Sequence, residues 1–168
     1  DNRIIAGLFH TINDIERIGD HAMNIMELTS EAYKKKIEFS EKAMTELKNL
    51  YECIFKILEL SLNSQKNNDI ITAHKVEPLE EVIDELIEKL KDRHIGRLCL
   101  QECNTQSGFV FLELLTNYER IGDHCLNIAV ETISRNDKNT MENLHNITNS
   151  TDEDYKTNYE KYLKRYGV

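Results

Sequence analysis

Residues 16–24 read ERIGDHAMN and residues 119–127 read ERIGDHCLN, so six consecutive residues recur unchanged and an Asn follows each His at the same distance. An identity of this length indicates an internal repeat rather than shared composition. Both copies stand inside long stretches whose apolar residues recur at spacings of three and four, which is the period of an amphipathic helix. We therefore expect two related helical units, each carrying one copy of the motif.

The composition favours an all-α protein. One Pro and six Gly among 168 residues leave few places where a helix must end. The net charge of −9 disfavours nucleic acid or an anionic membrane surface as a direct partner. No stretch approaches the roughly 18 apolar residues of a spanning helix. The chain opens without Met and directly in the helical pattern, so we expect it to continue a longer protein.

The four cysteines lie among apolar residues, which predicts reduced thiols packed as small apolar side chains in a cytosolic compartment. Cys99 and Cys103 are one helical turn apart if they share a helix. A zinc site that joins them to His94 or His124 is the less favoured alternative, because no second cysteine pair accompanies them.

The apolar period predicts four long helices, over about residues 3–33 or beyond, from the Ser40 cap to about 64, from the Asp69 cap to about 93, and over about 96–134. Ser40 and Asp69 are expected to cap the second and third of these. Pro78 marks either a kink in the third helix or its true start. The first helix is expected to bury Ile5, Leu8, Ile12, Ile15, Ala22, Ile25 and Met26, and the fourth Leu98, Val110, Leu114, Leu115, Tyr118, Ile121, Cys125, Ile128, Ala129 and Ile133.

Each copy of the motif places oxygen-bearing side chains one turn apart on one helix face. The sets are Glu16, Asp20 and Asn24 in the first copy, and Glu119, Asp123 and Asn127 in the second. Because neighbouring carboxylates repel each other, we expect a positive group to offset them. The candidates are Arg17 and Arg120, a lysine of a neighbouring helix, or a metal ion, for which oxygen ligands favour Mg, Mn, Ca or iron over Zn.

The glycine and the histidine of the motif each predict a structural role. Gly19 and Gly122 stand in mid-helix, where Gly costs about 1 kcal/mol relative to Ala, so each is expected to allow a close approach by another helix. His21 and His124 follow the Asp directly and turn away by about 100°. We expect them to form hydrogen bonds inside the bundle rather than to act as metal ligands.

The third helix carries a second group of acids between its apolar positions. Glu81 and Asp84 share a face at a spacing of three. We expect this pair to face Glu119 and Asp123 across a helix–helix contact, as inward carboxylates do in helical bundles.

Residues 115–129, LTNYERIGDHCLNIA, resemble the PhoU family of regulators of phosphate uptake. The closer resemblance is to the cytoplasmic PhoU-like C-terminal region of bacterial Na/phosphate cotransporters. Other segments fit the same resemblance, namely FSEKA at 39–43, HIGRL at 94–98, Cys103, GF at 108–109 and YEKYLKRY at 159–166.

The resemblance implies an all-α antiparallel helical bundle, because the family is built from two three-helix bundles in tandem. Residues 1–37 are then the last helix of a truncated first bundle, and residues 38–135 a complete three-helix bundle. Residues 136–150 form a polar loop, and residues 151–168 a short C-terminal helix whose expected cap is Thr151.

In the family, the E-x-x-x-D motif on the last helix of each bundle binds metal, including polynuclear iron clusters, with acids of the preceding helix. Carried over, this implicates Glu16 and Asp20 in one site. It implicates Glu119 and Asp123, together with Glu81 and Asp84, in the other. The second site is expected to be the intact one, because the helices that complete the first are absent from the sequence.

These implications lead to a functional hypothesis. We expect a non-enzymatic regulatory domain at the inner face of the cell membrane, joined to a transporter in the same chain or in trans. It would bind iron, Mn, Mg or Zn. The unpartnered apolar face of the first helix predicts a homodimer, and direct binding of phosphate stays open.

Two alternatives remain. A carboxylate-bridged dimetal enzyme of ferritin-like type needs Glu-x-x-His on two core helices. The one match, Glu142 with His145, lies in the polar loop. A metal-free helical interaction module needs no site at all.

Overall fold

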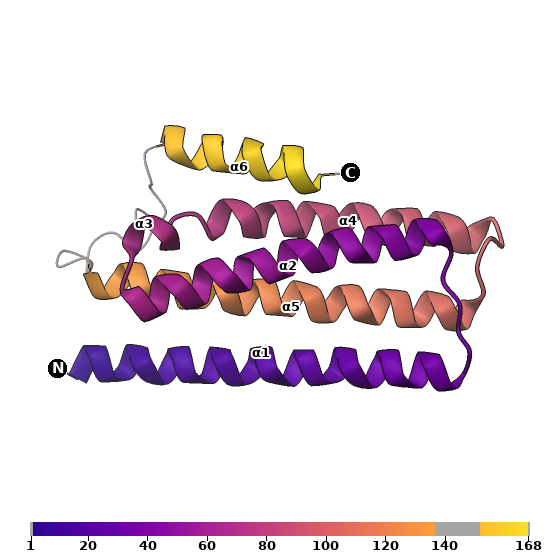
Figure 1. The fold of residues 1–168 in the computed structure, drawn as a ribbon, viewed down its shortest axis with the longest axis horizontal. Helices are drawn as coiled ribbons and strands as arrows, with labels where there is room; N and C mark the ends of the chain where they lie inside the picture. The colour runs from indigo at the N-terminus through magenta and orange to yellow at the C-terminus, as the bar shows by residue number, and fades with distance from the viewer. Residues whose placement is uncertain (1, 137–151, 168) are drawn as a thin grey trace.

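The computed structural model describes residues 2–136 and 152–167, which form six helices and no strand. The helices are α1 (Asn2–Lys34), α2 (Glu41–Asn67), α3 (Ile70–Ala73), α4 (Glu77–Cys99), α5 (Thr105–Asn136) and α6 (Asp152–Tyr166). Helices α2, α4 and α5 pack as an antiparallel bundle, α1 lies along α5, and α6 lies over α4 (Figure 1). The all-α prediction is confirmed. Residue 136, predicted to begin the polar loop, is the last residue of α5, and residues 137–150 and the Thr151 cap lie outside the described residues.

Helix starts follow the expected capping chemistry. The Ser40 hydroxyl accepts a hydrogen bond from the Ala43 amide at the start of α2, and the Asp69 carboxylate accepts one from the Thr72 amide. Asp69 caps only the short α3. Helix α4 starts separately with Pro78 in its first turn. Of the two alternatives for Pro78, the structure therefore shows a helix start, where its missing N–H costs nothing.

The predicted boundary between the third and fourth helices was wrong. Helix α4 continues through Gly96 to Cys99, and α5 begins only at Thr105. The break comes where Gln101 adopts a left-handed backbone with φ of 58° and Asn104 accepts a hydrogen bond from the Ser107 amide at 2.7 Å. Consequently Cys99 and Cys103 do not share a helix, and the geometry assumed for the zinc alternative is not present.

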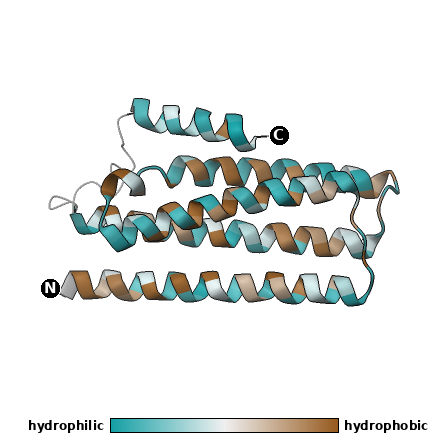
Figure 2. Ribbon diagram, in the orientation of Figure 1, coloured by the Kyte–Doolittle hydropathy of each residue, from teal (hydrophilic) through white to brown (hydrophobic). Residues whose placement is uncertain are grey.

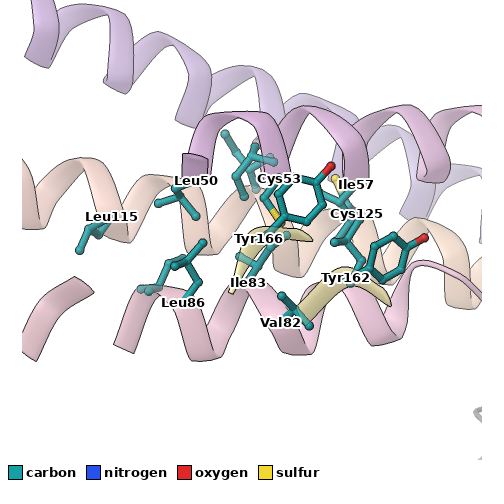
Figure 3. Packing of buried hydrophobic residues seen from close by; sticks show 14 of the residues in the cluster. Leu50, Cys53, Ile57, Val82, Ile83, Leu86, Leu115, Cys125, Tyr162 and Tyr166 are labelled. Atoms are coloured by element: carbon teal, nitrogen blue, oxygen red, sulfur yellow. The ribbon is translucent and has the colours of Figure 1, made fainter. Parts of the chain in front are cut away.

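The core lies between α2, α4 and α5. Leu50, Ile57, Ile83, Leu86 and Leu115 are fully buried there. Two tyrosines of α6, Tyr162 and Tyr166, close this core beside Cys53 (Figure 3). Of the inward positions expected on the last long helix, Val110, Leu114, Leu115, Ile121, Cys125, Ile128 and Ala129 are buried, whereas Leu98, Tyr118 and Ile133 are half-buried.

The predicted core face of α1 is largely exposed. Ile12 is 57% exposed and Ile15 46% exposed, and only Ile25 of the expected set is half-buried. Figure 2 shows apolar segments along α1, which lies at the outside of the assembly. The physical reason is that α1 packs along α5 and leaves its own apolar face without a second helix to bury it. None of the described helices is long and apolar enough to cross a bilayer.

Candidate functional site

The two motif copies face each other where α1 and α5 cross in antiparallel fashion. The rings of His21 and His124 stack with centroids 5.9 Å apart and planes at 28°. His21 Nδ1 lies 2.9 Å from Asn117 Oδ1 on the facing helix, and His124 Nδ1 lies 2.8 Å from Asp14 Oδ1. The expectation that both histidines form hydrogen bonds inside the bundle is confirmed.

The asparagines of the motif also reach across to the facing helix. Asn24 Nδ2 donates to Asn117 Oδ1 at 3.2 Å, and Asn127 Nδ2 donates to Asp14 Oδ1 at 3.3 Å. Their side-chain amides therefore act as donors between the two helices. The Oδ1 atoms of Asn24 and Asn127 take no part in these bonds, so their role as oxygen ligands beside the carboxylates stays a prediction.

Sequence reasoning missed Asp14 and Asn117. Each stands two residues before the Glu of its motif, so the two positions are equivalent in the repeat. Each receives the His and the Asn of the other copy, which gives the contact a local two-fold symmetry. The signal in the sequence was a polar residue at the same place in both copies, two residues before the Glu.

The acids of the second motif copy lie against acids of α4. Lys91 Nζ contacts Glu119 Oε2 at 2.8 Å, and Arg120 Nη1 contacts Asp123 Oδ2 at 3.3 Å. The charges of Asp123 also act on Glu80 and Asp84 of α4. We call Glu80, Asp84, Glu119 and Asp123 the acidic cluster.

Burial and repulsion between the carboxylates of the acidic cluster raise the pKa values of two of its members, Glu80 and Asp84. Burial, followed by the charges of Asp84 and Asp123, raises the pKa of Glu80 to about 7. Partial burial and the charges of Asp123 and Glu119 likewise raise the pKa of Asp84. Within the described ranges, neither Glu80 nor Asp84 forms an ion pair with a basic side chain. The charge of Lys91 favours the ionised form of Asp84, but burial and the neighbouring acids outweigh it.

The expected partner Glu81 does not face this cluster. Its carboxylate accepts a hydrogen bond from the Tyr155 hydroxyl of α6, and Glu85 accepts one from Tyr159. Glu80, one residue earlier and about 100° away around the helix, takes its place. The sequence did contain a signal, because Glu80 and Asp84 repeat the spacing of four found in both motif copies.

The acids of the first motif copy, Glu16 and Asp20, are exposed to solvent. Within residues 2–136 and 152–167, Asp20 forms one long ion pair, with Arg17 at 3.8 Å. In both copies the Arg pairs with the Asp three residues later, which confirms the intrahelical pairing considered for Arg17 and Arg120. The two copies are therefore alike in sequence and different in surroundings.

The acidic cluster has the oxygen ligands that a metal site needs, but its side chains are not positioned to bind one ion together. Carboxylate oxygens suit Mg, Mn or iron. Yet in residues 2–136 and 152–167 no three His, Cys, Asp or Glu side chains are arranged so that they could hold an ion together. Binding at this cluster would need carboxylate side chains to rotate toward a shared ion.

The two motif glycines do not serve the same purpose. Gly122 is buried, and a Cβ there would meet Ile83 and Glu80 of α4 at 3.8 and 4.0 Å, which are ordinary contact distances. A Cβ at Gly19 would meet nothing within 4 Å. The expected close approach is therefore wrong for Gly19 in this structure, and at Gly122 the neighbouring helix leaves room for a methyl group.

The replacement Gly19→Ala is expected to raise the free energy of unfolding by about 0.5–1 kcal/mol, because Ala costs less backbone entropy in a helix and meets no neighbour. Urea unfolding followed by circular dichroism measures the change. Gly122→Ala is the matched comparison in the second copy. A loss of stability in Gly19→Ala would show that another surface closes on α1 in solution.

The fold and the site define a class of protein, an all-α bundle in which an acidic E-x-x-x-D motif recurs on two antiparallel helices. Residues 47–132, just over half of the chain, match the PhoU domain. The chain belongs to the PhoU domain family, as the motif resemblance predicted. The matched region runs from α2 through most of α5 and includes the acidic cluster.

Two curated relatives are similar over most of the chain. It is 28% identical over 131 residues to the phosphate-specific transport system accessory protein PhoU homolog 1 of Thermotoga maritima, which covers 78% of this chain and 56% of the relative. It is 24% identical over 132 residues to a PhoU homolog of the same description from Deinococcus radiodurans, covering 77% and 59%. The chain thus spans a little over half the length of these relatives. No solved structure matches it significantly.

Proposed function

We propose that this chain is a non-enzymatic regulatory domain that modulates phosphate uptake from the cytoplasmic side of a membrane transporter. The observation that carries the proposal is membership of the PhoU domain family, together with similarity to accessory proteins of phosphate transport. The sequence resemblance to the C-terminal region of Na/phosphate cotransporters favours a transporter joined to this domain over a separate one. Such a domain acts through contacts with its transporter rather than through turnover.

We propose in addition that the acidic cluster takes up a metal ion, with iron, Mn, Mg and Zn as the candidates. The support is electrostatic. Glu80 and Asp84 have raised pKa values and form no ion pair with a basic side chain within the described ranges, so a cation between them and Asp123 would relieve the repulsion. Glu16 and Asp20 are exposed, and Arg17 pairs with Asp20, so this copy offers much weaker binding.

The test of metal binding uses the repeat as its own control. The double variant Glu119→Gln/Asp123→Asn removes two charges from the cluster, and Glu16→Gln/Asp20→Asn removes the same two from the exposed copy. After dialysis against Mn²⁺, elemental analysis and titration calorimetry are expected to show binding at least about tenfold weaker in the first variant and unchanged in the second. Equal losses, or no metal in the unmodified chain, would leave a metal-free interaction module.

Regulation is tested separately from metal binding, in cells that make the whole parent protein. The rate of radiolabelled phosphate uptake should differ from that of the unsubstituted protein in cells that carry Glu119→Gln/Asp123→Asn. It should equal that rate in cells that carry Glu16→Gln/Asp20→Asn. Unchanged uptake in both, measured with normal protein levels, would contradict a regulatory role of the cluster.

The homodimer predicted from the sequence remains part of the proposal. The exposed apolar side chains of α1 form the surface that a second copy or the rest of a longer chain would cover, and they include Ile4, Ile5, Leu8, Phe9, Ile12 and Ile15. Contiguous apolar surface of this kind marks interaction sites.

A further inference from the structure

A stripe of large side chains along α2 is largely exposed to solvent. Its members are spaced alternately four and three residues apart, which is the heptad spacing through which two helices pack along their lengths. Phe55 is 61% exposed and Leu62 42% exposed. We call the whole set the α2 stripe, and it consists of Met44, Lys48, Tyr51, Phe55, Leu58 and Leu62.

The α2 stripe is a second apolar face, separate from the face that α2 turns to the core. On the core face, Leu50, Cys53, Ile54 and Ile57 are buried. A helix that is apolar on two faces is typical of a helix covered on both. In the described part of the chain, α2 has only its core face covered.

The α2 stripe borders the exposed apolar face of α1. Both helices pack on α5 (Figure 1). They meet where Gln65 Nε2 of α2 donates to Thr11 Oγ1 of α1 at 3.2 Å. Gln65 stands one place beyond Leu62 in the spacing of the stripe, and Ile15, which is 46% exposed, lies one turn after Thr11. A helix laid along the α2 stripe would therefore also reach the edge of α1.

The α2 stripe is complementary to itself when two copies of the helix run antiparallel. Residue 53 marks the two-fold axis if Tyr51 of one copy lies opposite Phe55 of the other. Positions equally far from residue 53 then face each other, so Met44 lies opposite Leu62. Large apolar side chains thereby meet at both ends of the contact and at its centre, which is the packing that a helix pair needs.

Charged residues along the α2 stripe fit the same antiparallel pairing. Lys48 of one copy stands within one position of Glu59 of the other, and Glu41 stands within one position of Lys66. All four side chains belong to exposed residues. Two-fold symmetry forms each pair twice, and opposite charges beside an apolar seam select partner and orientation. A parallel pairing in register would instead place each of these charges against its own like.

The two-fold axis brings together one pair of like charges, the Glu52 side chains of the two copies. Beside Glu52 lies a hollow of about 500 Å³, which Lys56 and Arg165 also line. The Arg165 guanidinium lies over the Tyr166 ring at 5.1 Å. Each copy therefore supplies two cations close to this pair, and they offset its repulsion.

We propose that two copies of this chain pair through α2, antiparallel, with Tyr51 of each copy opposite Phe55 of the other. The contact runs along most of the 27 residues of α2 and takes in the neighbouring edge of α1. The pairing deepens the homodimer of the proposed function and rests on it. It requires neither metal in the acidic cluster nor regulation of phosphate uptake.

The first test places a charge at the centre of the α2 stripe. Sedimentation equilibrium is expected to show a dimer dissociation constant at least about thirtyfold higher in Phe55→Glu than in the unmodified chain. Phe109→Glu is the matched control, because Phe109 is 62% exposed and lies on α5 outside the stripe. We expect that control to stay within about twofold of the unmodified chain.

The second test exchanges charges to check the register. Lys48→Glu and Glu59→Lys are each expected to weaken the dimer about tenfold, because each variant turns two favourable pairs into two like-charge pairs. The double variant restores opposite charges and should return to within about threefold of the unmodified chain. Glu59 also pairs with Lys56 of its own helix at 2.7 Å, so circular dichroism checks that each variant keeps its helix content.

The third test uses disulfide cross-linking to read the orientation of the two copies. Met44→Cys and Leu62→Cys chains are mixed and oxidised, both carrying Cys99→Ser and Cys103→Ser because those two native cysteines are not buried. The antiparallel pairing is expected to join residue 44 of one chain to residue 62 of the other. A parallel pairing would join each position to itself, which contradicts the proposal.

The outcomes separate the placement of the interface from the existence of a dimer. Dissociation by Phe55→Glu, together with cross-links between positions 44 and 62, supports the proposal. Monomers in Phe9→Glu, on α1, but not in Phe55→Glu would keep the homodimer and overturn its placement at α2. An unmodified chain that stays monomeric at about 0.1 mM would overturn both, and would leave the stripe to a helix of another protein or of a longer chain. The regulatory proposal would stand in either case, because it is tested by uptake.

Discussion

Replacing both Tyr162 and Tyr166 by Ala is expected to lower the free energy of unfolding by about 4 kcal/mol, as truncations of large buried side chains do. The two tyrosines are 6% and 3% exposed and close the core formed by α2 and α4 (Figure 3). Their loss leaves the rest of α6 held mainly by surface contacts. Urea unfolding measures the change, and iodoacetamide reports whether the Cys53 thiol becomes accessible.

The matched control for this variant is Tyr155→Phe/Tyr159→Phe on the same helix. It removes the hydroxyls that donate to Glu81 and Glu85 at the edge of the α4–α6 contact and leaves the apolar packing in place. We expect a loss of about 1 kcal/mol or less and no reaction at Cys53. If the Ala variant behaves like this control, α6 does not contribute to the core in solution.

The substitution Glu80→Gln is expected to stabilise the protein at pH 8, by about 1–2 kcal/mol, and to have little effect at pH 5. The ordinary pKa of 4.5 is raised to about 7 in the folded chain. Below pH 4.5 the carboxyl is protonated in both states. Between pH 4.5 and 7 only the folded state keeps the proton, so rising pH favours unfolding. Above pH 7 the folded state carries the full cost of the buried charge, which Gln avoids.

Stability curves from pH 5 to 8 measure this effect, with Glu88→Gln as the control. Glu88 lies on the same helix and is exposed, so its substitution removes the same charge without relieving the acidic cluster. A gain for Glu80→Gln that does not grow with pH, or that Glu88→Gln matches, would show that Glu80 is not held among the charges of Asp84 and Asp123. Added Mn²⁺ should reduce the gain at pH 8 if the cluster binds the ion.

The positions of most helices in this protein could be predicted from local sequence. The period of three and four predicted the helices, and Ser40 and Asp69 predicted starts that the structure shows, because periodicity and capping act within a turn or two of chain. The repeated ERIGDH segment predicted the two related helices and the family. The helix end at Cys99 was misplaced because Gly96 is tolerated within a helix, while the true stop depends on Gln101 and Asn104.

Tertiary structure alone decided which groups meet. One residue along a helix turns a side chain by about 100°, so the rotation of α4 against α5 selects Glu80 for the acidic cluster and gives Glu81 to α6. Packing also decides that Ile12 of α1 is exposed, although the apolar residues of that helix recur with the period of a buried face. It also brings His94 and Arg97 to the starts of α2 and α5, because contacts between distant segments are set by helix packing and not by spacing within any one helix.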